Sequence, residues 1–354
     1  QTRAQTCGKA AGYALPRVVG MLPWTPRHPW GSWIYQQLIL SMAVASLVVT
    51  AMRVGHEVAE GSRWTIVLGD CIIALSAVAG LLACGTLRWS KELESAERAM
   101  LAYTARIDIK TPWERMTAIE IAIAAGLWAA VAVCHAYVVL LDGKLAWSQD
   151  VAAFSVATFL NMGMAAYLIH LCRGMTVMAD TFCNNVSETL AFKAAVPEWN
   201  FLRAVVRRTC DAMQHCWVVL LTCAAVVTLL VLMVTSFDQE VEVRALPQLM
   251  LAIAVLRVTV WAAAVTAKCT HVAPMVNSLG LESAQGACAG DPPALEGASE
   301  DQSVSPDRMY AVQYIEESEA GFYVYELRVT IAAIVKALYI ACAICIGIVT
   351  KLDA

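Results

Sequence analysis

Apolar residues occur along this chain in long blocks that are separated by polar stretches of uneven length. A block of about 20 apolar residues is long enough to cross a membrane as a helix. The hydropathy pattern predicts seven such blocks. They cover residues 33–52, 64–87, 117–141, 151–171, 213–236, 246–267 and 329–350. We therefore expect an all-α, multi-pass membrane protein with seven transmembrane helices.

The polar stretches carry their own pattern. Residues 87–107 and 184–213 have the spacing of amphipathic helices with charged faces, and we expect them to extend the spanning helices into the cytoplasm. Residues 278–308 are rich in Gly, Ser, Pro and acidic side chains, which predicts a disordered insert. The predicted organisation is an amino-terminal segment (1–32), six spans with cytoplasmic extensions (33–277), the insert (278–308), and an anchor helix with the last span (309–354).

The distribution of basic residues predicts the orientation of the chain. The amino-terminal segment and the second, fourth and sixth connections together carry 18 Lys and Arg residues, whereas the remaining connections and the carboxyl-terminal end carry 5. Basic residues are retained on the cytoplasmic side of a membrane. We therefore expect the amino terminus in the cytoplasm and the carboxyl terminus outside the cell membrane, the reverse of a G-protein-coupled receptor.

Composition narrows the classes of function. The chain is 59% hydrophobic and only 15% charged, with a mean hydropathy of +0.60, whereas soluble domains carry about 25% charged residues. None of the 13 cysteines falls in a segment predicted to lie outside, which argues against a disulfide framework. No phosphate-binding loop, metal-ligand cluster or nucleophile constellation is present, so we predict neither an enzyme nor a bound cofactor. No basic patch with interleaved aromatic residues indicates nucleic acid.

The last apolar block, 329–350, contains two polar side chains, Lys336 and Tyr339, three residues apart. Such a spacing places both side chains on one face of a helix. A lysine in hydrocarbon is costly, so this face is expected to meet protein or water rather than lipid. Ala343 and Ile346 continue the same stripe at helical spacing.

Several polar and aromatic residues lie within the other spans and are candidates for a ligand pocket in the outer half of the bundle. Asp70 and Arg257 are charges inside spans, which are functional candidates by default, although a structural pair between helices is the alternative. Aromatic residues and a lone histidine are more often packed in the core than used for binding. The candidates are Asp70, Trp128, His135, Tyr137, Phe154, Asn161, Gln248 and Arg257. Such a mixed set suits a small molecule with apolar and hydrogen-bonding parts.

The predicted topology and the carboxyl-terminal stretch together resemble the arthropod gustatory and odorant receptor superfamily. Gly321, Phe322 and Tyr323 look like the Gly-Phe-Phe element of gustatory receptors, and Tyr339 falls about where the family has a tyrosine. Three positions depart from the family pattern: Leu338, Cys345 and Ile346 replace threonine, glutamine and phenylalanine.

This resemblance implies a divergent gustatory-receptor-like protein that works as a homotetrameric, ligand-gated cation channel, with or without co-receptor subunits. The last helix of each subunit would line one central pore, and the cytoplasmic extensions would anchor the subunits to each other. The residues implied to face the pore are Lys336, Tyr339 and Ala343, with Cys345 and Ile346 at the gate. Each subunit would bind a small molecule among its helices, within membrane lipid.

Other readings of the sequence stay open. Four lysines facing one pore would repel cations, which favours a non-conducting receptor or scaffold of the same fold. A G-protein-coupled receptor would need the opposite orientation. A haem protein would need histidines paired at matched depth, whereas the depths estimated for His135, His170 and His215 differ.

Overall fold

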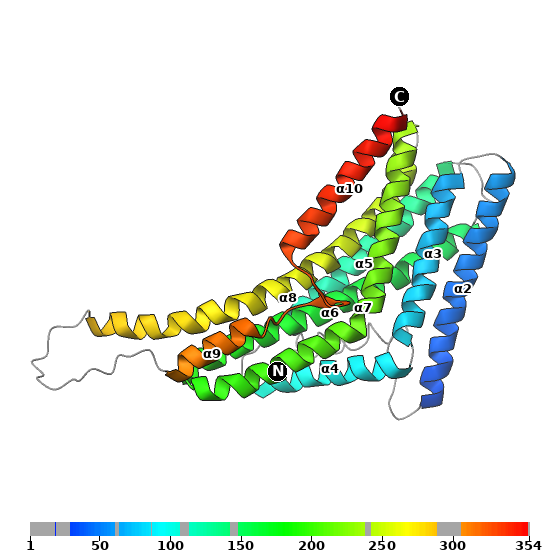
Figure 1. Cartoon of the computed structure of the whole chain (residues 1–354). Coiled ribbons are helices and arrows are strands. Elements are labelled where there is room, and N and C mark those ends of the chain that lie inside the picture. Colours follow the sequence, from blue (N-terminus) through cyan, green and yellow to red (C-terminus); the bar gives the residue numbers. More distant parts are fainter. Residues whose placement is uncertain are drawn as a thin grey trace, which may run out of the picture.

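The computed structural model describes residue 18 and residues 29–60, 64–85, 87–106, 113–141, 148–237, 242–288 and 306–352. These residues are almost wholly helical, which confirms the predicted all-α class (Figure 1). The long helices are α2 (Pro29–Ala59), α3 (Trp64–Gly85), α4 (Leu87–Arg106), α5 (Trp113–Leu141), α6 (Ser148–Thr189), α7 (Phe192–Phe237) and α8 (Glu242–Cys288). They are followed by α9 (Pro306–Glu317), the strands β1 (Tyr323–Val324) and β2 (Leu327–Arg328), and α10 (Ile331–Leu352).

Within these described residues, five helices are long and apolar enough to cross a membrane. They contain the predicted first, third, fourth, fifth and sixth spans, and the predicted second span coincides with a shorter apolar helix, Val67–Ala83. The last predicted span falls on α10. The chain is therefore a membrane protein, whereas the number of seven spans and the orientation of the termini stay predictions.

The helices extend well beyond their apolar blocks. The helices α6, α7 and α8 have 42, 46 and 47 residues, and their extensions lie together with α4 and α9 as a separate layer below the upright helices (Figure 1). Residues 184–213 are not one helix, because α6 and α7 meet at Leu190, whose φ of 49° closes α6. Helix α8 continues to Cys288, so the first part of the predicted insert 278–308 is helical, and most of the remainder lies outside the described residues.

Helix α6 is the centre of the bundle. It packs against α2, α3, α4, α5, α7 and α8, and 78% of its most apolar window is buried. Its buried side chains include Tyr167, Phe182 and Met164, which join the main hydrophobic core with Trp199 of α7. Helices α2 and α5 lie at the periphery instead, with only 22% of their apolar windows buried.

A tight hairpin joins α9 to α10 at the place of the predicted Gly-Phe-Phe-like element. Phe322 is fully buried, and Tyr325 and Glu326 form the turn between the strands with φ angles of 46° and 67°. Positive φ at both central residues is typical of a type I′ hairpin turn. Two α7 side chains hold this turn, because the backbone N–H of Tyr325 donates to Gln214 (3.1 Å) and its hydroxyl hydrogen-bonds His215 (2.6 Å).

Helix α10 stands apart from the bundle (Figure 1). Among the described elements, only α7 and α8 make more than a marginal contact with α10. Ile331, Val335, Tyr339 and Ile340 are each more than half exposed, although this helix is strongly apolar. A helix of this composition needs lipid or another protein surface around it.

Candidate functional site

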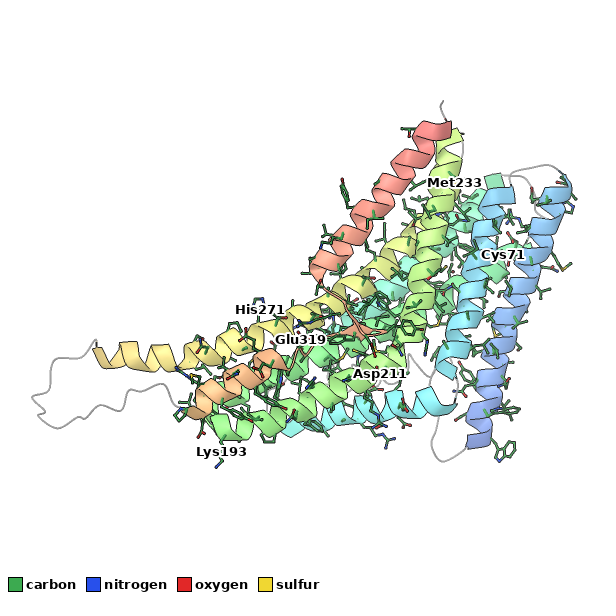
Figure 2. All side chains as sticks on the ribbon, in the orientation of Figure 1. Cys71, Lys193, Asp211, Met233, His271 and Glu319 are labelled. Atoms are coloured by element: carbon green, nitrogen blue, oxygen red, sulfur yellow. The ribbon has the colours of Figure 1, made fainter. Side chains whose placement is uncertain are left out.

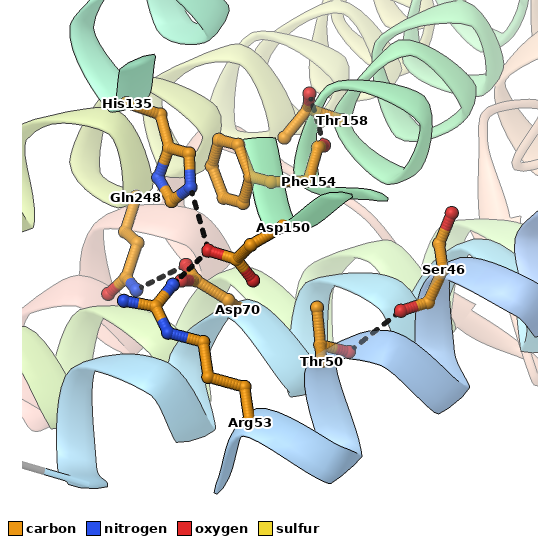
Figure 3. A network of polar contacts seen from close by, with 9 residues as sticks. All are labelled: Ser46, Thr50, Arg53, Asp70, His135, Asp150, Phe154, Thr158 and Gln248. Atoms are coloured by element: carbon orange, nitrogen blue, oxygen red, sulfur yellow. Dashed lines mark hydrogen bonds and ion pairs between the residues drawn. The ribbon is translucent and has the colours of Figure 1, made fainter. Parts of the chain in front are cut away.

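Five polar side chains from five different helices meet at one end of the bundle (Figure 3). We call them the aspartate cluster: Arg53 of α2, Asp70 of α3, His135 of α5, Asp150 of α6 and Gln248 of α8. They meet because α2 and α5 approach this end with their last turns, whereas α3, α6 and α8 begin there. If the predicted orientation holds, this is the outward-facing end.

The aspartate cluster is held by two short hydrogen bonds. The Arg53 guanidinium donates to Oδ2 of Asp150, and the Gln248 amide donates to Oδ1 of Asp70 (2.9 Å). His135 Nε2 lies 3.6 Å from the same Asp150 Oδ2, and the ring of Phe154 stacks on the imidazole with centroids 3.9 Å apart. Asp70, His135, Asp150 and Gln248 are buried, and the Arg53 side chain is 11% exposed.

Several buried polar side-chain atoms lack a hydrogen bond among the described residues, in this cluster and elsewhere in the bundle. Asp150 Oδ1 and His135 Nε2 are buried without a partner among the residues that the structure describes. An unsatisfied buried polar group typically costs about 1–3 kcal/mol, and more if it is charged. In native proteins such atoms are satisfied by ordered water, an ion or a ligand.

Gly69 allows α8 to approach α3 at this place. A Cβ atom at position 69 would lie 2.6–2.9 Å from the side-chain amide of Gln248. Only glycine leaves room for the amide that binds Asp70. The hydrogen bond between Gln248 and Asp70 therefore depends on a glycine at position 69.

A second polar group lies beside the cluster, between α3 and α6. Asn161 donates to the carbonyl of Ile73 (2.9 Å) and accepts from the Ser76 hydroxyl (2.9 Å). A cavity of about 10 Å³ is lined by Asn161, Gln248 and apolar residues of α7 and α8. It has room for one water-sized sphere and not for an organic molecule. In this conformation the site is closed.

The remaining predicted pocket residues lie elsewhere. Trp128 donates its indole N–H to the carbonyl of Ser155 (3.0 Å) and packs edge-on against Phe159, so it joins α5 to α6. Tyr137 is 55% exposed. Arg257 lies in a different group of charges. The structure therefore brings together Asp70, His135, Phe154 and Gln248, with Asn161 nearby, and the ligand-binding role of all eight stays a prediction.

The other group of charges, which we call the glutamate cluster, comprises Glu97, Glu120, His170, Arg173 and Arg257. Arg173 and Arg257 each donate to one carboxylate oxygen of Glu120, at 2.6 and 2.7 Å. His170 Nε2 lies 3.6 Å from Glu97.

Aromatic side chains and one hydroxyl complete the glutamate cluster. Trp113 stacks on the His170 ring with centroids 4.9 Å apart, and Thr117 hydrogen-bonds His170 Nδ1 (2.8 Å). The Arg173 guanidinium lies 4.3 Å from the ring centre of Trp261, a distance at which a cation–π contact is favourable. The glutamate cluster is thus tied into the packing of α4, α5, α6 and α8.

The predicted pore residues lie on α10. Lys336, Tyr339 and Ala343 are exposed in the single chain, and Tyr339 is 75% exposed. Cys345 and Ile346 belong to the helix, but their side chains lie outside the described residues. Among the described residues, no group of three or more His, Cys, Asp or Glu side chains is placed to hold a metal ion.

The comparisons with known proteins identify the fold. No protein-family model and no curated protein sequence matches the chain. Among solved structures it is similar to an insect olfactory receptor, OR5 of Machilis hrabei, over 96% of both chains, with a TM-score of 0.57 and 8% sequence identity. The resemblance inferred from topology is thus confirmed at the level of the fold.

Proposed function

We propose, for a chain that has the fold of an insect olfactory receptor, that it is a chemoreceptor of the gustatory-receptor-like kind. Four copies would form a ligand-gated cation channel in the cell membrane, with cytoplasmic amino termini. The helix α10 of each copy would line a central pore, as the family resemblance implies. A small-molecule ligand would bind at the aspartate cluster, in the outer half of each subunit.

The placement of α10 carries this proposal. An apolar helix that belonged to a monomeric bundle would bury one face against its neighbours. Instead, α10 exposes Val335, Lys336 and Tyr339, and among the described elements it packs mainly against α7 and α8. Lipid tolerates the apolar positions but not the lysine. A water-filled pore between four copies of α10 would accommodate both.

The hairpin supports a coupling between ligand site and pore. It is packed on α7 through Gln214 and His215 and leads directly into α10. Helix α7 also contacts α3, which carries Asp70. A change at the aspartate cluster therefore has a continuous packed route through α3 and α7 to the base of α10.

The first test is whole-cell current from cells that express this chain alone, with a panel of sugars, amino acids and small apolar compounds. We expect a ligand-evoked cation current, and we expect Lys336→Gln to shift its reversal potential towards that of a more cation-selective pore. Lys268→Gln is the matched control, because Lys268 is half exposed and pairs with Asp180 on the extensions of α6 and α8. Its reversal potential should equal that of the wild type.

A non-conducting receptor or scaffold of the same fold is the second candidate, and Lys336 is the observation that favours it. Four ammonium groups at one level of a pore would oppose cation entry. In that case neither the wild type nor Lys336→Gln would carry current. Saturable binding of a panel compound to protein at the cell surface, without current, would then support a receptor that lacks an open pore.

A further inference from the structure

A cavity much larger than the one beside the aspartate cluster lies in the layer of helix extensions. It has a volume of about 440 Å³ and is partly open. Residues of α8, of α9 and of the strand β2 form its walls, and Figure 2 shows Glu319 just past the end of α9. Small-molecule pockets have volumes of about 300–1,000 Å³, so this cavity has room for a small organic ligand.

The cavity lies beside the ends of two predicted spans. Its α8 wall runs from Cys269 to Asn277, directly after the sixth predicted span (246–267). Arg328 lines the cavity from β2, directly before the last predicted span (329–350). If the predicted orientation holds, the cavity therefore opens to the cytoplasm at the level of the lipid headgroups, at the opposite end of the spans from the aspartate cluster.

Arg328 is a partly buried cation of this cavity that no carboxylate balances. One terminal nitrogen of its guanidinium donates to the Thr270 hydroxyl (3.0 Å) and to the carbonyl of Ala320 (2.9 Å). Its Nε is buried without a hydrogen bond, and no carboxylate of the described residues forms an ion pair with it. A guanidinium has five N–H donors and binds acidic groups through parallel hydrogen bonds. Arg328 therefore has donors left for an anionic group that enters the cavity.

Two carboxylates line the same cavity, from the last turn of α9 and the residues after it. Glu316 and Glu319 are exposed and, like Arg328, have no ion-pair partner among the described residues. Their charges repel a ligand with several negative charges and attract an amine. The apolar part of the wall comprises Ala273, Pro274, Val312 and Ile315. The cavity thus offers a partly buried cation, two exposed carboxylates and an apolar surface.

We propose that this cavity is a binding site for a zwitterion, with the acidic group of the ligand on Arg328 and its amine on Glu316 and Glu319. Such a ligand balances the partly buried charge of Arg328 and adds no net charge to the cavity. Two sources carry this chemistry: the phosphoethanolamine headgroup of a membrane phospholipid, and a free amino acid. The position of the cavity beside the ends of two predicted spans is accessible to both.

The site is placed to act on α10. Arg328 belongs to the strand that leads into this helix, and its hydrogen bond to Thr270 joins that strand to α8. Gly321 allows this close packing, because a Cβ there would lie 3.0 Å from the Arg328 Nε and 3.2 Å from Thr266. A ligand on Arg328 therefore holds the hairpin against α8 and fixes the base of α10. An effect on current rests on the proposed function, whereas binding does not depend on conduction.

The test is isothermal titration calorimetry of the purified, delipidated full chain in detergent with three probes. Short-chain phosphatidylethanolamine and leucine are the zwitterions, and short-chain phosphatidylglycerol has the phosphate without the amine. We expect saturable binding of at least one zwitterion, with phosphatidylglycerol bound more weakly. Binding of phosphatidylethanolamine alone identifies a lipid headgroup as the ligand, and binding of leucine alone identifies a free amino acid. Binding of neither zwitterion, or equally tight binding of phosphatidylglycerol, would overturn the proposal.

Replacement of the cation assigns the binding to this cavity. Arg328→Gln should weaken binding of the zwitterion about tenfold, because a charge-assisted hydrogen bond to its acidic group is lost. Arg308→Gln is the matched control, because Arg308 of α9 is also largely buried with an unbonded Nε but does not line the cavity. It should bind as the wild type does. Equal affinities of Arg328→Gln and Arg308→Gln would refute the assignment.

Replacement of the carboxylates tests the amine. The double variant Glu316→Gln, Glu319→Gln should weaken binding of the zwitterion and leave that of phosphatidylglycerol equal or stronger. Glu317→Gln is its control, since Glu317 bonds Gln313 and does not line the cavity. Both carboxylates are exposed, so this variant should fold even if Arg328→Gln does not, and wild-type affinity for the zwitterion would then count against the proposal. Silence in current recordings would count against the channel and not against this site.

Discussion

The two clusters of buried charge in this bundle differ in their balance. The glutamate cluster has two carboxylates, Glu97 and Glu120, and two guanidiniums, Arg173 and Arg257, so it is neutral without any contribution from its histidine. The aspartate cluster has two carboxyl groups and one guanidinium, so with both carboxyls ionised and the histidine neutral it carries a net charge of −1. Both clusters stack that histidine on an aromatic ring.

The two clusters differ in formal charge more than in hydrogen bonding. In the glutamate cluster each guanidinium has a carboxylate oxygen of Glu120 at 2.6–2.7 Å, although Arg173 Nε and His170 Nε2 have no hydrogen bond among the described residues. Both clusters leave their histidine Nε2 without a hydrogen bond among the described residues, and only the aspartate cluster also leaves a carboxylate oxygen, Asp150 Oδ1, in that state. We infer that the glutamate cluster fixes the helices, because Glu120 pairs with a guanidinium from each of two other helices.

The largest expected effect is that of Glu120→Gln. This substitution leaves two largely buried guanidiniums facing each other without a carboxylate, and breaking a buried pair in this way costs about 3–5 kcal/mol. The thermal midpoint of the purified protein in nanodiscs should fall markedly. Glu94→Gln is the control, since Glu94 pairs with an exposed Arg98 and such pairs contribute about 0–1 kcal/mol. Equal midpoints for the two variants would show that the glutamate cluster is not structural.

The next effect compares two glycines, one beside each cluster. A Cβ at Gly174 would lie 2.7 Å from the Trp113 ring, whereas a Cβ at Gly69 would meet the flexible end of Gln248. We expect Gly174→Ala to destabilise the protein by about 2 kcal/mol and Gly69→Ala by about 1 kcal/mol, because overpacking against a rigid ring is harder to relieve. Thermal unfolding measures both.

The control for these two variants is Gly126→Ala, because nothing lies within 4 Å of a Cβ at that position of α5. Alanine in place of glycine should there stabilise the helix by up to about 1 kcal/mol. Gly69→Ala should in addition weaken ligand responses, since it displaces the amide that holds Asp70. If Gly69→Ala leaves both stability and ligand response unchanged, Gln248 is not part of the site.

The smallest expected effect is that of Asp70→Asn. The replacement keeps an oxygen for the Gln248 N–H and removes the surplus charge, so the thermal midpoint should change by the equivalent of less than about 1 kcal/mol. The loss of a carboxylate would then be tolerated in the aspartate cluster and not in the glutamate cluster. A destabilisation as large as that of Glu120→Gln would mean that the two clusters are alike.

The sequence predicts the helices better than the contacts between them. Hydropathy places the apolar blocks correctly, because each block falls on a helix of the structure. Arg53 and Asp150 lie directly outside predicted spans and therefore count as loop charges, although α2 and α6 run past them. Glu120 lies inside the predicted span 117–141 and meets the criterion that singled out Asp70 and Arg257. It is the partner of Arg257 that sequence reasoning missed.

The pairing of charges requires knowledge that a single sequence does not contain. Both Asp70 and Arg257 are in structural pairs between helices, but with Gln248 and Glu120 rather than with each other. Which helix faces which depends on side-chain packing, such as the room that Gly69 leaves for Gln248. Hydropathy cannot predict that packing, because it reports only the apolar character of each segment.

The central position of α6 has a consequence for biogenesis. Its mean hydropathy of 1.6 is the lowest of the five candidate spans, whereas its buried share is the highest. A helix that carries Asn161, His170 and Arg173 gains little from entering lipid alone, since polar residues oppose insertion. Helix α6 is therefore expected to leave the translocation machinery only in company with its neighbours, so that assembly of the bundle and entry into the bilayer are one event.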